Sequence, residues 1–167
     1  MYIDMDNKEF KEAFGSMAKA YGFGRNFGCW FKESSECIFV FLLQKSNFGN
    51  YYYVNFKIFI QGAFGHQYKA SKELFKNDVG DIFLRNPKEY DSAFDLDLTL
   101  GSEERLQIMN TLFKNIIVPL SEKALSKAGI FELEQRRILG IRPWVSILPA
   151  VREELEKLLL KSSESNV

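Results

Sequence analysis

Residues 37–44 read CIFVFLLQ, a run that is apolar at almost every position. It is far shorter than the roughly 18 uncharged apolar residues that a membrane-spanning helix needs, and no other window reaches that length. A strand that is apolar on both faces has to be covered on both sides, at least in part. The run therefore predicts a central strand of a sheet, with other elements packed against both of its faces.

Two further strands are predicted beside this run. Residues 25–32 and 51–60 each alternate large apolar side chains along one face, with the period of two that is typical of strands. The connections, residues 33–36 and 45–50, are short and polar, and the second contains Asn and Gly residues that favour a turn. Short connections predict antiparallel neighbours in a meander.

Helical periodicity indicates helices at both ends of the chain. Asp6 and Glu9 form a capping-box-like start for a helix over residues 6–21. A long helix is expected over residues 103–120, where Pro119 must kink or end it because the proline ring clashes with a carbonyl one turn earlier. A short helical piece, stopped by Gly129, and a last helix that begins near Pro149 are expected to follow.

Residues 91–100 show the clearest alternation in the chain and predict a fourth strand. The expected fold is thus α+β, with an N-terminal helix, an antiparallel β-meander of about four strands and a helical C-terminal third. We expect one domain over the 167 residues, with its core at about 6–160 and a frayed tail at 161–167. One sheet face should pack the two long helices, and the other should be partly open or roofed by the C-terminal tail.

Charge and composition exclude several classes of function. The chain has 22 Lys and Arg residues against 22 Asp and Glu residues, which argues against general binding to nucleic acid or acidic lipid. Its N-terminus lacks the apolar stretch of a signal peptide. The four late arginines at 136, 137, 142 and 152 are interspersed with acids, which favours a solvated, salt-bridged surface over an anion site.

The cysteines and the single histidine exclude further kinds of site. Cys29 and Cys37 are too few for a disulfide framework and form no CxxC motif, so we expect buried, reduced thiols in a cytoplasmic protein. His66 is alone, which excludes a His-rich metal centre. No glycine motif of a phosphate-binding loop is present. No cofactor and no metal are expected.

The second face of the strand at 51–60 is the candidate binding surface. Aromatic side chains are interleaved there with an amide and a cation, at Tyr51, Tyr53, Asn55 and Lys57. Such a surface suits a peptide, a ring-containing ligand or single-stranded nucleic acid, although the same residues could simply roof the sheet. Two acids from one face of the fourth strand, Asp95 and Asp97, could complete an acid–base or ion-binding site, or merely solvate the strand.

Several short motifs together resemble a known bacterial family. They are Gly22-Phe23, Trp30-Phe31, QKSNFG at 44–49 and YVNFKI at 53–58. The chain is similar here to the domain of unknown function 4304, although it has Phe56-Lys57 where that family usually has Leu-Gly. The resemblance implies an α+β protein without established activity. Because some members of the family sit among toxin–immunity and other conflict systems, it also implies a protein-binding role.

Two functional hypotheses follow from the sequence. The first is a non-enzymatic module that binds another protein, supported by the aromatic surface, by the absence of a catalytic motif and by the resemblance. The second is a small-molecule-binding or hydrolytic protein with a cleft around Asn55, Lys57, Asp95 and Asp97. Convergence of these four groups in a deep pocket would favour the second hypothesis. The sequence does not specify an oligomeric state.

Overall fold

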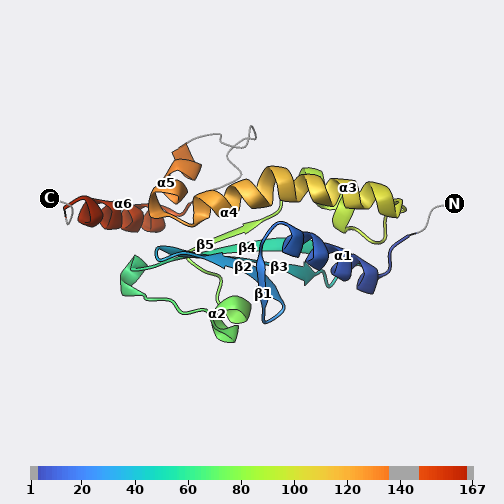
Figure 1. Ribbon diagram of the computed structural model, residues 1–167, viewed down its shortest axis with the longest axis horizontal. Coiled ribbons are helices and arrows are strands. Elements are labelled where there is room, and N and C mark those ends of the chain that lie inside the picture. Colours follow the sequence, from blue (N-terminus) through green and yellow to red (C-terminus); the bar gives the residue numbers. More distant parts are fainter. Residues whose placement is uncertain (1–3, 136–146, 165–167) are drawn as a thin grey trace.

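The computed structural model describes residues 4–135 and 147–164 and shows a five-stranded antiparallel sheet with helices on both faces (Figure 1). The strands lie side by side in chain order: β1 (Gly24–Asn26), β2 (Cys29–Glu33), β3 (Cys37–Lys45), β4 (Tyr52–Ile60) and β5 (Ile82–Arg85). The predicted α+β fold is confirmed, with one strand more than expected.

The first face of the sheet packs against long helices. These are α1 (Asn7–Ala20) and a continuous helical run made of α3 (Ser102–Leu112), the π-helix η3 (Phe113–Ile117) and α4 (Val118–Ala124). Phe14 of α1 is fully buried, and its ring lies 5.0–6.0 Å from the rings of Trp30, Phe41 and Phe113. The Asp6–Glu9 capping box at the start of α1 is confirmed. Aromatic side chains from both helices and the sheet therefore form the main core.

The second face carries a smaller core under the short helix α2 (Lys72–Asn77). Phe75 of α2 packs there with Cys29 and Val40, which confirms that residues 37–44 are covered on both faces in part. Cys37 belongs to the core of the opposite face, so the two free thiols are separated by the sheet. Burial raises the pKa of both thiols, that of Cys37 to about 12.

Two strand predictions were wrong. Residues 25–32 form a hairpin rather than one strand, because Phe27 and Gly28 both have positive φ (53° and 74°) and turn the chain between β1 and β2. Residues 91–100 form no strand: they contain the end of the 3₁₀ helix η2 (Lys88–Phe94) and a loop, with a single bridge between Tyr51 and Asp95. The strand beside β4 is instead β5.

The helix does not end at Pro119, and the predicted stop at Gly129 was wrong. The chain stays helical across Pro119, because the π-helical turn before it bonds the Val118 N–H to the Phe113 carbonyl, five residues back. Gly129 does not stop a helix but lies within α5 (Lys127–Gln135). A Cβ atom there would overlap the main-chain oxygen of Lys123, so the absence of a side chain lets α5 approach the end of α4.

The last described helix is α6 (Pro149–Glu164), and its neighbour in space is the 3₁₀ turn η1 (Ala63–Gly65), where the Phe64 N–H donates to Glu154. No helix within residues 4–135 and 147–164 has the length and apolar character needed to cross a membrane. Of the predicted basic concentration, the arginines at 136, 137 and 142 and the nearby Trp144 lie outside the described residues.

Candidate functional site

Helix α2 covers only one end of the second sheet face, and the other end is open. In the register of the open end, Gln44 of β3 lies opposite Tyr53 of β4, and Asn55 lies opposite Arg85 of β5. Tyr51 precedes β4 and its ring contacts that of Tyr53 edge to face, with centroids 5.6 Å apart. We call these five residues, Gln44, Tyr51, Tyr53, Asn55 and Arg85, the tyrosine face.

Arg85 is held in place by three neighbours on this face. Its guanidinium lies over the Tyr53 ring at 4.3 Å, its Nε donates to Asn55 Oδ1 at 3.3 Å, and a terminal nitrogen donates to Gln44 Oε1 at 3.4 Å. Asn55 Nδ2 also donates to Gln44 Oε1, at 2.6 Å. Stacking and hydrogen bonding together fix the planar guanidinium at the surface before any partner arrives.

The hydroxyl groups of the two tyrosines shift each other's pKa. Hydrogen bonds from Ser46 and from Tyr53 lower the pKa of Tyr51, and the bond to Tyr51 raises the pKa of Tyr53. Both rings are half-buried, and their edge-to-face contact packs one ring against the other.

A pocket of about 340 Å³ adjoins the tyrosine face, lined by Tyr51 and Tyr53 together with Asp91, Asp95 and Leu98. Asp91 accepts a 2.8 Å hydrogen bond from Asn86, and Asp95 accepts one of 3.0 Å from the main-chain N–H of Asp97. Carboxylates beside tyrosine rings form a favourable environment for a positively charged side chain.

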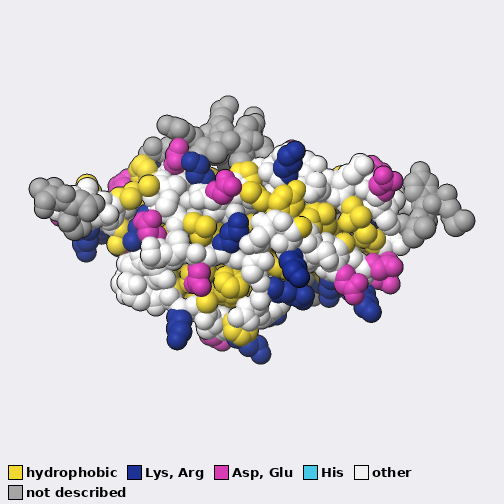
Figure 2. Space-filling view, in the orientation of Figure 1, with side chains coloured by type: hydrophobic (Ala, Val, Ile, Leu, Met, Phe, Trp, Pro, Cys, Tyr) yellow, Lys and Arg dark blue, Asp and Glu magenta, His cyan; other side chains and the backbone are white. Residues whose placement is uncertain are grey.

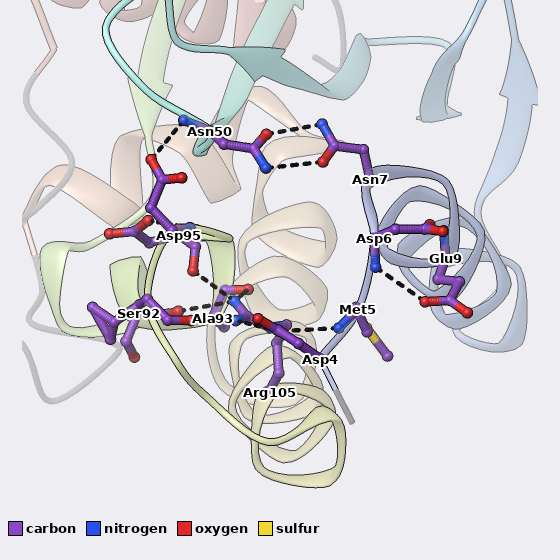
Figure 3. Close-up of polar contacts among 12 residues, drawn as sticks. Asp4, Met5, Asp6, Asn7, Glu9, Asn50, Ser92, Ala93, Asp95 and Arg105 are labelled. Atoms are coloured by element: carbon purple, nitrogen blue, oxygen red, sulfur yellow. Dashed lines mark hydrogen bonds and ion pairs between the residues drawn. The ribbon is translucent and has the colours of Figure 1, made fainter. Parts of the chain in front are cut away.

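The loop at residues 46–50 leads into Tyr51, which lines this pocket, and carries Phe48, whose side chain is 93% exposed. The loop is nevertheless anchored at both ends. Ser46 N–H donates to the Tyr51 carbonyl at 2.8 Å, Phe48 N–H donates to Ser46 Oγ at 3.1 Å, and Asn50 N–H donates to Asp97 at 2.8 Å. The side-chain amides of Asn50 and Asn7 exchange two hydrogen bonds, which tie the loop to α1 (Figure 3).

Arg105 of α3 holds the other wall of the pocket from beneath. It is fully buried, and its two terminal nitrogens donate to four main-chain carbonyls, those of Ser92, Ala93, Asp95 and Leu98, at 2.9–3.2 Å (Figure 3). An ion pair with Asp4 at 3.5 Å adds to these contacts. Because the guanidinium takes up these carbonyls, residues 92–98 form the end of η2 and a loop around it rather than a strand.

The structure brings together some of the predicted site residues and separates others. Tyr51, Tyr53 and Asp95 line one pocket, and Asn55 lies next to it under Arg85. Lys57 lies on the same sheet face but at the covered end, where its Nζ donates to the Phe75 carbonyl at 2.7 Å. Asp97 faces the loop at 46–50, where it accepts the Asn50 N–H.

Sequence reasoning missed Phe48, Arg85 and Gln44. Phe48 had a readable signal, since it is a large apolar residue in the otherwise polar connection KSNFGN. Arg85 could have been found only by recognising IFLR at 82–85 as a strand, which its short length and the neighbouring Gly80 and Pro87 obscured.

His66, the single histidine, lies in the segment that follows β4. Its Nδ1 lies 3.2 Å from the Tyr68 hydroxyl, which donates to Asp81 at 3.0 Å, and Asp81 also accepts the Ile60 N–H at 2.8 Å. These bonds tie the segment after β4 to the sheet. In the part of the chain that the structure describes, no cluster of three or more His, Cys, Asp or Glu side chains is arranged to hold a metal ion.

Comparison with known proteins identifies one family. The family described as Domain of unknown function (DUF4304) matches residues 14–123, from the middle of α1 to the end of α4. That range contains the sheet, the tyrosine face, Phe48 and Arg105. Neither the curated proteins nor the solved structures include a match to the chain.

Proposed function

This chain belongs to the Domain of unknown function (DUF4304) family, and we propose that it is a non-enzymatic, cytoplasmic bacterial module whose tyrosine face binds another protein. The partner suggested by the family resemblance is a toxin or another component of a conflict system. Support comes from the geometry of the open sheet end, where aromatic rings, an arginine and an adjoining pocket occupy one continuous surface.

The observation that carries the proposal is the exposure of Phe48 on an anchored loop. A phenylalanine ring in water forgoes roughly 1.5–3 kcal/mol that burial would recover. A loop held by hydrogen bonds at Ser46 and Asn50 loses little further conformational freedom when its tip is covered. Phe48 is therefore placed to insert into a pocket of the partner at low entropic cost.

The surrounding residues suggest what the partner presents. Tyrosine and arginine are over-represented among the residues that dominate binding energy at protein interfaces, and here Tyr53 and Arg85 are already stacked. The neighbouring pocket, with Asp91 and Asp95 beside the tyrosine rings, would accept a lysine or arginine side chain. We infer that the partner segment combines an apolar pocket for Phe48 with a basic side chain for the acidic pocket.

The alternative hypotheses draw less support. A cleft around Asn55, Lys57, Asp95 and Asp97 requires these groups to converge, but the contacts of Asn55, Lys57 and Asp97 are with other partners. Single-stranded nucleic acid would meet Asp91 and Asp95 next to Arg85, and these carboxylates repel phosphates.

A pull-down from the source bacterium tests the proposal with three variants. Phe48→Ala and Arg85→Ala should each lose a protein that the wild type retains. The control, Phe64→Ala, removes another exposed ring (48% exposed) beside α6 and should retain that protein. Recovery of the same proteins by all four baits, in folded form by circular dichroism, would contradict a binding role for the tyrosine face.

A further inference from the structure

A second hollow, of about 540 Å³, lies between α1 and the β1–β2 hairpin. Its walls carry Lys11 and Lys19 from α1 and Arg25 from β1, and Trp30 and Gly15 form part of its floor. Figure 2, in the orientation of Figure 1, shows Lys and Arg side chains gathered where α1 and β1 lie. We call this hollow the basic groove.

The charge of the groove is unbalanced in a chain whose formal net charge is zero. Three cations line it against one acid, Glu12. Within residues 4–135 and 147–164, Lys11, Lys19 and Arg25 form no ion pair. Their contacts are with rings instead: Lys11 lies 5.8 Å from the Tyr52 ring and Arg25 lies 5.5 Å from Trp30. The lining of the groove therefore carries an excess of positive charge, three cations against one acid.

Trp30 adds a hydrogen-bond donor to these charges. The residue is only 5% exposed and lies against Gly15, where an added Cβ would come within 3.4 Å of the indole Cζ2. Its indole Nε1 donates to no other residue that the structure describes, and this atom is not fully shielded from solvent. A buried indole normally finds an acceptor, so a donor at the groove surface marks a place for one.

We propose that the basic groove binds an acidic peptide segment of a protein. The carboxylates of that peptide would pair with Lys11, Lys19 and Arg25 and accept the indole N–H of Trp30. Lys11 and Lys19 are eight residues apart on α1, a separation of about 12 Å along the helix axis. An extended peptide spans about 13 Å in four residues, so acids four positions apart match the two lysines.

The geometry favours a peptide over nucleic acid. Single-stranded nucleic acid gains much of its binding from bases stacked on open aromatic faces. Both aromatic residues of the groove, Trp30 and Phe23, are 5% exposed, and cations already cover them, Arg25 over Trp30 and Lys32 over Phe23 at 4.6 Å. Peptide carboxylates require no open aromatic face, because they bind to the cations and to the indole N–H. This proposal does not depend on the tyrosine face, since it rests on different residues of the chain.

Fluorescence anisotropy with a labelled decapeptide of alternating Glu and Gly tests the proposal, with the alternating Lys and Gly decapeptide and a ten-nucleotide oligothymidine as comparison probes. We expect the Glu peptide to bind, and we expect its affinity to fall as salt is added. The triple variant Lys11→Gln, Lys19→Gln and Arg25→Gln should lose affinity at least about tenfold. Glu12→Gln should gain affinity severalfold, because it removes the acid that repels the peptide.

The matched control variant is Lys69→Gln, Lys88→Gln and Lys114→Gln, which removes the same charge from exposed positions outside the groove. It should bind the Glu peptide within about twofold of wild type. In a ¹H–¹⁵N spectrum, the Trp30 indole signal should shift on binding. Equal losses in both triple variants, an unmoved indole signal, or tighter binding of oligothymidine than of the Glu peptide would overturn the proposal.

Discussion

The ammonium group of Lys57 donates a 2.7 Å hydrogen bond to the main-chain carbonyl of Phe75, so a cation on β4 holds α2 against the second sheet face. Lys57 is 5% exposed, and Phe75 is fully buried. Lys57 was predicted to lie on a binding surface but is a structural residue. It lies between the covered end and the open end of the sheet.

Lys57→Met should lower the free energy of unfolding by about 1–3 kcal/mol at pH 7, because it leaves the Phe75 carbonyl buried without its strong donor. Urea denaturation measures this change. The exposed Lys69→Met should stay within about 0.5 kcal/mol of wild type. A loss no larger than that of the control would show that the Lys57 bond does not hold α2.

The Lys57 contribution should also depend on pH. Burial lowers the pKa of Lys57, so the folded protein releases this proton at a lower pH than the unfolded chain does. The unfolded state binds more protons between the lowered pKa and the ordinary value of 10.5, and the stability of the wild type rises with pH across that window. The gap between wild type and Lys57→Met should therefore widen toward alkaline pH. A gap that narrows would contradict this sign.

Arg105→Met should destabilise the protein by about 3–5 kcal/mol, because four carbonyls lose their donor in a buried site. Asp4→Asn should cost at most about 1 kcal/mol, since the Asp4 side chain is 47% exposed and its pairing with Arg105 is screened by water. Thermal unfolding of both variants separates the two contributions. Equal losses would assign the role of Arg105 to the ion pair rather than to the carbonyls.

Two helical glycines should respond in opposite ways to alanine. Gly129→Ala should destabilise by about 1–3 kcal/mol, because the new Cβ would overlap the Lys123 carbonyl oxygen and force α5 away from α4. Gly15→Ala should stabilise α1 by up to about 1 kcal/mol, since its Cβ meets only ordinary contact with Trp30. Denaturant midpoints compare the two variants directly. A stabilised Gly129→Ala would mean that the close approach of the two helices is not needed.

Local sequence patterns were sufficient where one element determines its own structure. The run at 37–44, the alternation at 51–60 and the Asp6 capping box each predicted an element that is present. The hairpin within residues 25–32 was hidden because a positive φ at Phe27 carries no signal of its own. The sequence left open whether Pro119 kinks or ends the helix, because the π-helical turn that lets the helix continue depends on backbone bonding rather than on residue type.

Contacts between distant residues explain the remaining errors. Residues 91–100 alternate like a strand. Arg105, which follows them in the chain, binds main-chain carbonyls of this segment, which forms the end of η2 and a loop instead. The correct face was assigned to Tyr51, Tyr53, Asn55 and Lys57, yet the boundary between its covered and open ends is set by α2. No local pattern could show where that helix would lie.

Site-specific photo-crosslinking tests the central claim, that the surface around Phe48 contacts a partner protein. Benzoylphenylalanine would replace Phe48 in one sample and Phe64 in the other, both in the full chain expressed in its source organism. We predict a covalent adduct with one defined protein from position 48 only, which Arg85→Ala in the same chain should diminish. No adduct from position 48, or the same adduct from both positions, would show that the surface around Phe48 is not a specific binding site.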